Sequence, residues 1–149
     1  MPLNIVLFEP EIPNNTGNIG RLALASGSNL HLVKPFGFEL NDKRLKRAGL
    51  DYWPHISLFI YDSIEDFYKK HKEKNLVYFS SHGAQNHWSI AYEDDMFLVF
   101  GKESVGLSNE IITANTDKLY KIPLFSPHIR SLNLANAVSI VVYEGLKHI

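Results

Sequence analysis

Three segments of the chain combine glycines, charged side chains and asparagines in patterns that could bind a ligand. The first, residues 9–21, follows an apolar run and contains Gly17, Gly20 and Arg21. Backbone N–H groups in such a turn, together with the positive end of a following helix, attract anions, and Arg21 could bind a phosphate through two N–H groups. The segment lacks the Gly-Lys-Ser/Thr of a Walker A loop and the full dinucleotide fingerprint. The pattern alone leaves open an ordinary capped turn with a surface arginine.

The second segment, residues 97–107, runs from an apolar stretch into Gly101 and Gly106, with Glu103 between them. Open α/β sheets bind ligands at the carboxyl ends of their strands, where glycine lets the backbone approach a ligand closely. The Glu103 carboxylate could accept hydrogen bonds from backbone N–H groups and hold this loop. An ordinary strand–turn–helix with an exposed Glu103 is the alternative.

The third segment, residues 122–137, joins an apolar run to an apolar helix through a proline-bounded loop. Ser131 is placed to cap the start of that helix. Asn133 and Asn136 lie three residues apart and share a face, and polar groups in so apolar a helix need partners. They could tie down a neighbouring loop or contact a ligand.

The elements that must position these segments alternate between short apolar runs and amphipathic stretches. Helices are predicted at 18–26, 63–72 and 108–114. The apolar runs are nearly continuous, which is typical of strands covered on both faces. Six such strands are predicted, at 4–8, 30–34, 56–61, 76–80, 96–100 and 118–122. The alternation indicates an α/β fold with a mostly parallel six-stranded sheet and helices on both faces.

The last predicted helix, residues 131–148, is apolar around nearly its whole circumference. Such a helix does not lie on a wet surface. Small residues such as Ala135, Ala137 and Gly145 would let another helix approach closely. The helix is therefore either a central core helix or a subunit interface, and in a chain of this length we favour the interface.

The composition narrows the class of protein. A chain of 149 residues is the usual size of one domain, 1–149, and the absence of cysteine excludes disulfides and thiolate metal sites. The histidines are scattered without carboxylates at metal-ligand spacing, so we expect no metal site. No signal-peptide pattern opens the chain, and no apolar run approaches the ~20 residues of a membrane span. We therefore expect a cytoplasmic protein that does not bind membranes.

The net charge of −1 gives no overall attraction to nucleic acid. If the protein binds RNA, a local patch must supply the attraction. Lys43, Arg44, Lys46 and Arg47 stand within five residues and are a candidate patch. A solvated helix face is the alternative explanation for this charge run.

The three segments, in this order, resemble the motifs of the SPOUT-class RNA methyltransferases. Within that class they are most similar to the bacterial tRNA (cytidine/uridine-34-2'-O)-methyltransferases. Lys102 departs from the resemblance, because related sequences often carry proline there. The matching stretches are residues 4–19 with Arg21, 42–52, 100–107, and 122–139 with Tyr143 and Glu144.

The resemblance implies a C-terminal trefoil knot and a homodimer that packs through its terminal helices. It implies S-adenosylmethionine as methyl donor, without a metal, and transfer of the methyl group to a ribose 2'-hydroxyl in tRNA. The implied target is the wobble nucleotide 34, a cytidine or modified uridine. The alternatives are methylation of another RNA site, a non-catalytic RNA-binding module, and a phosphate-binding hydrolase that uses the 16–17 turn with Glu103.

The resemblance also implies roles for individual residues. The adenosine half of the cofactor would lie against Phe79, Gly101, Ile122 and Ser131, with Glu103, Gly106 and Asn133 supporting the loops. The substrate side would be Arg21, Asn14 and Asn18, reached across the dimer interface. From the cationic run we expect Lys43, Arg44 and Arg47 to hold RNA.

Arg21 is the implied catalytic residue. A guanidinium holds its proton too tightly to be a comfortable general base. We expect Arg21 instead to grip a neighbouring phosphate and stabilise the developing alkoxide. A phosphate oxygen or water would then accept the proton.

Overall fold

Seven parallel strands form one sheet in the computed structural model, which describes residues 2–48 and 52–149. The strand order is β3-β2-β1-β6-β4-β7-β5, and every pairing of named strands is parallel. The strands are β1 (Asn4–Phe8), β2 (Asn29–Val33), β3 (Leu58–Tyr61), β4 (Leu76–Phe79), β5 (Gln85–Asn86), β6 (Phe97–Phe100) and β7 (Leu119–Lys121). The parallel α/β sheet is confirmed.

The prediction of six strands is wrong by one. The additional strand, β5, pairs with β7 at the edge of the sheet through only two residues, Gln85 and Asn86. Both residues are polar, so the strand has no apolar run for the sequence to reveal.

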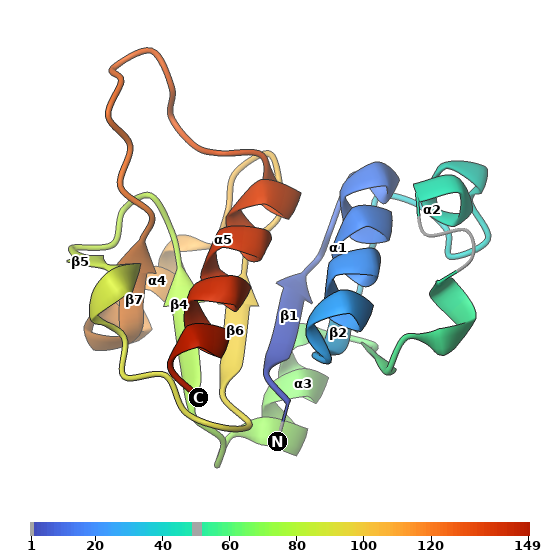
Figure 1. Cartoon of the computed structure of the whole chain (residues 1–149), viewed down its shortest axis with the longest axis horizontal. Helices are drawn as coiled ribbons and strands as arrows, with labels where there is room; N and C mark the ends of the chain where they lie inside the picture. Colours follow the sequence, from blue (N-terminus) through green and yellow to red (C-terminus); the bar gives the residue numbers. More distant parts are fainter. Residues whose placement is uncertain (1, 49–51) are drawn as a thin grey trace.

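Helices cover both faces of the sheet, as predicted (Figure 1). Helices α1 and α5 pack on one face, where Ile19, Ala23 and Val138 join a core that includes Ile5 and Leu7 of β1. Helices α3 and α4 pack on the other face, against the alternate side chains of the same strands. The helices are α1 (Pro13–Ser26), α2 (Lys43–Ala48), α3 (Ile64–His71), α4 (Asn109–Ala114) and α5 (Leu134–Lys147), with short 3-10 turns η1 (Trp53–His55), η2 (His87–Ser89) and η3 (Thr116–Lys118).

Helix α1 begins five residues earlier than predicted, because Pro13 occupies its first turn, where a missing N–H costs nothing. The expected glycine turn is therefore part of the helix. A Cβ on Gly17 would lie 2.8 Å from the Leu45 carbonyl oxygen, and a Cβ on Gly20 would lie 2.9 Å from the Trp53 ring. These glycines allow α2 and η1 to pack closely on α1, which corrects their assignment to a ligand-binding turn.

Helix α5 begins at Leu134 and is capped by Asn133, whose Oδ1 accepts a hydrogen bond from the Asn136 N–H at 3.2 Å. The prediction that Ser131 caps this helix is wrong. Val138 and Val141 are fully buried against the sheet, whereas Ile140 and Tyr143 are 41% and 50% exposed. Helix α5 is thus a core helix on its inner face and retains an exposed apolar outer face.

Within the two described ranges, no helix combines the length and apolarity that a membrane crossing requires.

A hydrogen-bonded histidine is buried in the sheet. His31 on β2 contacts the Tyr61 hydroxyl through Nδ1 at 2.7 Å and Asn4 Oδ1 through Nε2 at 2.9 Å. A neutral imidazole suits both partners, since Nε2–H donates to the amide oxygen and Nδ1 accepts from the hydroxyl. Burial lowers the pKa of His31 from its ordinary value to about 3.

This histidine should make stability depend on pH. The unfolded chain protonates His31 below pH 6.5, while the folded protein resists protonation until about pH 3. The free energy of unfolding should therefore decline as pH falls from 6.5 towards 3, by on the order of 5 kcal/mol from this residue. Denaturant unfolding of His31→Gln should show a shallower decline than the wild type. His55→Gln, at an exposed site, should match the wild type, and parallel curves for all three proteins would contradict the assignment.

Candidate active site

A cavity of about 470 Å³ opens at the carboxyl ends of β4, β6 and β7, a size typical of small-molecule sites. The residues predicted to hold the adenosine line it together with those predicted to support the loops. They are Phe79, Gly101, Ile122, Ser131, Glu103, Gly106 and Asn133. The structure thus brings residues from three distant segments to one edge of the sheet, where parallel α/β proteins bind ligands.

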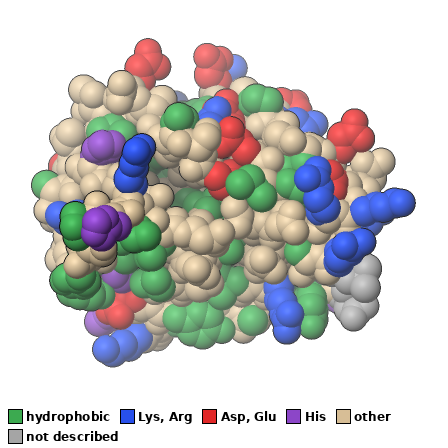
Figure 2. All heavy atoms as spheres, turned by 90° about the horizontal axis from the view of Figure 1, so that it is seen from above, with side chains coloured by type: hydrophobic (Ala, Val, Ile, Leu, Met, Phe, Trp, Pro, Cys, Tyr) green, Lys and Arg blue, Asp and Glu red, His purple; other side chains and the backbone are tan. Residues whose placement is uncertain are grey.

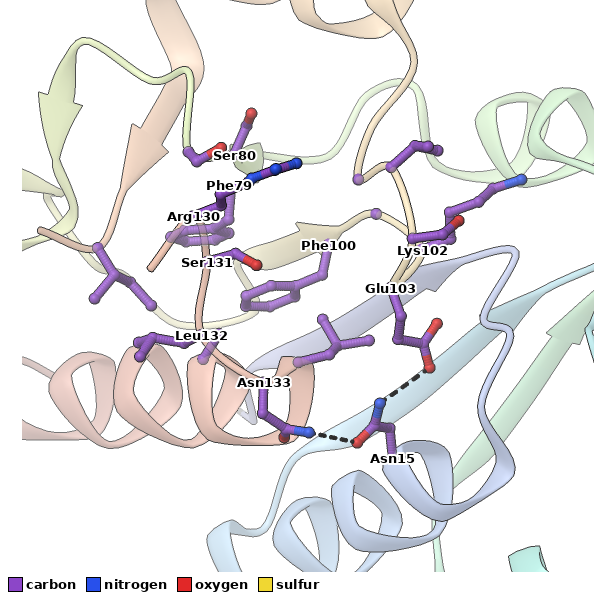
Figure 3. A pocket seen from close by; sticks show the side chains of 18 of the residues that line it. Asn15, Phe79, Ser80, Phe100, Lys102, Glu103, Arg130, Ser131, Leu132 and Asn133 are labelled. Carbon is purple, nitrogen blue, oxygen red and sulfur yellow. Dashed lines mark hydrogen bonds between the residues drawn. The ribbon is translucent and has the colours of Figure 1, made fainter. Parts of the chain in front are cut away.

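Other cavity residues had no predicted role. Asn15, Ser80, Phe100, Arg130 and Leu132 also line the cavity (Figure 3). The Phe79 and Phe100 rings stack with their centroids 4.7 Å apart, so part of the cavity lining is a pair of stacked aromatic rings. Phe100 could have been anticipated, because it precedes Gly101 at the end of an apolar run.

Glu103 joins the β6–α4 loop to the start of α1. Its carboxylate accepts hydrogen bonds from the Glu11 N–H at 2.8 Å and the Ile12 N–H at 2.9 Å. These N–H groups belong to the turn that the sequence predicts as an anion site. The anion they bind in this structure is the protein's own carboxylate, so they are not free for a substrate phosphate.

A second carboxylate makes the reciprocal connection. Glu11 accepts hydrogen bonds from Ser104, through N–H at 2.8 Å and Oγ at 3.0 Å. The backbone hydrogen bond from Ser104 is the main cause that lowers the pKa of Glu11. Lys102 adds an ion pair, with Nζ 3.3 Å from Glu9 Oε1. The β1–α1 and β6–α4 loops are thus joined by charged contacts from both sides.

Asn15 links all three segments. Its amide nitrogen donates to Glu103 Oε2 at 3.2 Å, and its amide oxygen accepts from Asn133 Nδ2 at 3.0 Å (Figure 3). Asn15 is only 6% exposed, so these bonds are largely shielded from water. The Asn133–Asn15–Glu103 chain of hydrogen bonds fixes the cavity wall formed by the start of α5.

Gly101 is required by the loop itself. A Cβ at this position would overlap the Gly106 carbonyl carbon and the Leu107 nitrogen, and it would lie 2.7 Å from the Gly106 oxygen. Gly106 has φ +70°, in the left-handed region that favours glycine, and its N–H donates to the Lys102 oxygen at 2.8 Å. The two glycines therefore close a tight turn, whereas the sequence suggested that Gly101 makes room for a ligand.

The residues predicted on the substrate side lie apart from this cavity. Arg21, Asn14 and Asn18 are exposed on α1 and do not line it, and the Arg21 guanidinium lies 5.0 Å from the centre of the Tyr52 ring. The predicted RNA-binding residues Lys43, Arg44 and Arg47 are exposed on α2, where Arg44 forms a 3.1 Å ion pair with Asp42. Part of the matching stretch 42–52, residues 49–51, lies outside the described residues.

The charges of the molecule are unevenly placed. Viewed from above, cationic side chains gather at the right, on the side of α2, and cationic and histidine side chains gather at the left (Figure 2). Most of the acidic side chains visible in this view lie at its centre and upper edge. Over residues 2–48 and 52–149, no group of three His, Asp or Glu side chains is arranged to hold a metal ion.

The sequence and the fold are similar to those of known RNA methyltransferases. The profile described as the SpoU rRNA Methylase family matches residues 2–143. A relative from Saccharophagus degradans, named tRNA (cytidine(34)-2'-O)-methyltransferase, is 45% identical over 147 residues, which cover 98% of this chain and 95% of the relative.

Solved structures give the same relationship. One, described as giving structural insights into the 2-OH methylation of C/U34 on tRNA, is 42% identical and has a TM-score of 0.93. The match covers 98% of this chain and 95% of that one. Another, an AdoMet-bound rRNA methyltransferase from Sinorhizobium meliloti, is 26% identical and has a TM-score of 0.89. The match covers 99% of this chain and 57% of the chain of that methyltransferase. Sequence and fold agree over nearly the full length, and the chain belongs to the SpoU methylase family.

Proposed function

We propose that this protein, as one domain spanning 1–149, transfers a methyl group from S-adenosylmethionine to the 2'-hydroxyl of nucleotide 34 in tRNA, a cytidine or modified uridine. The observation that carries the proposal is the cavity at the carboxyl ends of β4, β6 and β7, walled by all three motif segments. The named activity of the Saccharophagus degradans relative supports the same substrate.

The cavity suits the proposed cofactor in shape and chemistry. Apolar and aromatic side chains such as Phe79, Phe100 and Ile122 match the faces of an adenine, and the polar edge includes Ser131 and Arg130. When bound, S-adenosylmethionine supplies an electrophilic methyl group. The hydrogen bonds of Glu103 and Asn15 would keep the walls in place, which serves the alignment that an in-line displacement needs.

Arg21 would act on the RNA. Its exposed guanidinium can form paired hydrogen bonds to a phosphate and stabilise negative charge developing on the ribose oxygen. Asn14 and Asn18 lie on the same helix and would contact the same nucleotide. Because these residues do not line the cavity of their own chain, we propose that they serve the cavity of a partner subunit. Lys43, Arg44 and Arg47 would hold the RNA backbone nearby.

We propose a homodimer that packs through the outer face of α5. Ile140 and Tyr143 leave apolar surface exposed there, and Leu24 on neighbouring α1 is 38% exposed. We expect Ile140→Glu to yield monomers in light scattering, because burying a carboxylate against an apolar surface is costly. Phe59→Glu, at an exposed aromatic on edge strand β3, is the control and should leave the assembly unchanged. A dimer that persists in Ile140→Glu would place the interface elsewhere.

We also propose that the C-terminal part of the chain forms a trefoil knot. After α4 on one face of the sheet, the chain forms β7 beside β4 and returns through residues 122–133 to α5 on the opposite face. This path supports threading of the C-terminal segment through the loops that wall the cavity. Activity on tRNA also favours a cytoplasmic location.

Calorimetry separates the proposed function from its rivals. A methyltransferase should bind S-adenosylhomocysteine in the cavity and show no heat with ATP. A phosphate-binding hydrolase should show the reverse, and a non-catalytic RNA-binding module should bind tRNA and neither small molecule. Binding of ATP alone, or of neither nucleoside, would refute the proposal.

A further inference from the structure

One aromatic side chain close to the cavity is almost entirely exposed to solvent. Phe125, in the loop 122–133 between β7 and α5, is 90% exposed. Its neighbour Leu124 lines the cavity, and so does Arg130 further along the same loop, whereas Phe125 does not. The loop rises from the sheet above β7 (Figure 1). Phe125 therefore presents its ring at the rim of the cavity and outside it.

The loop belongs to a stretch of the sequence that contains cationic but no acidic residues. No acidic residue occurs between Asp117 and Glu144, although the chain as a whole has a net charge of −1. The same stretch contains Lys118, Lys121, His128 and Arg130. The left side of Figure 2, above which this loop rises in Figure 1, shows hydrophobic side chains among cationic and histidine ones.

An exposed aromatic ring flanked by cations suits an unpaired nucleotide. Proteins that bind single-stranded RNA stack bases on aromatic faces and neutralise the backbone with nearby Lys and Arg. A second copy of the same loop fits less well, since a twofold contact would bring positive residues against positive residues. The loop from 122 to 131 also offers no carboxylate to pair with them.

We propose that Phe125 is a stacking platform for an unpaired base of the substrate RNA next to the methylated nucleotide. The inference rests on the proposed function and assigns to this loop part of the recognition of the anticodon loop. His128, exposed on the same loop, contacts an adjoining phosphate. Phe125 acts in RNA binding and leaves the cofactor cavity unchanged.

Steady-state kinetics on tRNA test this role. Phe125→Leu keeps an apolar side chain but removes the aromatic face, and we expect it to raise KM for tRNA roughly tenfold with kcat nearly unchanged. Phe125→Trp should keep the wild-type KM. Phe59→Leu makes the same substitution at an exposed site on the opposite edge of the sheet. This control should leave kcat and KM for tRNA unchanged.

Fluorescence gives a readout that does not depend on activity. An anticodon stem-loop RNA should quench Phe125→Trp more strongly than the wild type, whose Trp53 and Trp88 supply the background. An unchanged KM in Phe125→Leu, in an enzyme that methylates tRNA, would overturn the inference and leave the proposed function standing. Loss of S-adenosylhomocysteine binding or of the dimer in Phe125→Leu would also overturn it, by assigning the ring to the cofactor or to a second copy. A wild type without methyl transfer would refute the proposed function itself.

Discussion

Replacing Gly101 with valine should abolish measurable binding of S-adenosylhomocysteine. The new Cβ would overlap the backbone of Gly106 and Leu107, so the turn that walls the cavity could not close. Backbone atoms cannot move aside as a flexible side chain can, and the loop must therefore adopt another path. We expect the affinity to fall by a hundredfold or more, which corresponds to about 3 kcal/mol.

The control for this variant is Thr113→Val, which adds the same side chain at an exposed position of α4. It should bind the ligand as the wild type does. Circular dichroism should show native secondary structure in both variants. Wild-type affinity in Gly101→Val would mean that the 101–107 turn does not form the ligand site.

Replacing Arg21 with alanine should lower turnover on tRNA by about a hundredfold or more, because it removes charge stabilisation from the transition state. Binding of S-adenosylhomocysteine should stay unchanged, since Arg21 does not line the cavity. Neutralising Lys43 and Arg44 should instead raise KM and weaken its salt dependence, with kcat close to normal. A higher KM in Arg21→Ala, together with lost turnover in the Lys43 and Arg44 variant, would contradict this assignment. Arg21 would then act in RNA binding and α2 in the reaction.

Mixing two inactive variants tests whether Arg21 acts across the dimer. In a heterodimer of Arg21→Ala with Gly101→Val, one cavity is intact and faces an intact Arg21 from the partner. Subunit exchange should therefore restore roughly a quarter of wild-type activity, because half of the dimers have one working site. No recovery after demonstrated exchange would mean that Arg21 serves its own chain.

Strands and most helices could be predicted because their apolar patterns are local. β4 and β6 are continuous apolar runs, β1 is apolar after Asn4, and β2 is interrupted by His31. The predicted helices at 63–72 and 108–114 are present as α3 and α4, capped by Ser63 and Ser108. The start of α1 was missed because its local sequence does not favour a helix. Asn14, Asn15 and Gly17 are poor helix formers, and only packing against other elements makes this segment helical.

The connections within the site could not be predicted, because they join residues far apart in the sequence. Asn15 is 88 positions from Glu103 and 118 positions from Asn133. Each of the three side chains lies in one of the three segments singled out in the sequence. Their contacts with one another, however, depend on the strand order. The steric need for glycine at position 101 could not be predicted for the same reason, since the atoms that exclude a side chain belong to a turn closed by tertiary structure.

The most direct test of the account is to map the methyl group that the protein adds to tRNA. Purified protein would be incubated with labelled S-adenosylmethionine and tRNA, and the product would be digested to nucleosides and sequenced around the label. A matched tRNA with 2'-deoxyribose at nucleotide 34 would be the control substrate. The account predicts 2'-O-methylation at nucleotide 34 and no label in the deoxy substrate. Label on a base, at another nucleotide, or retained in the deoxy substrate would contradict it.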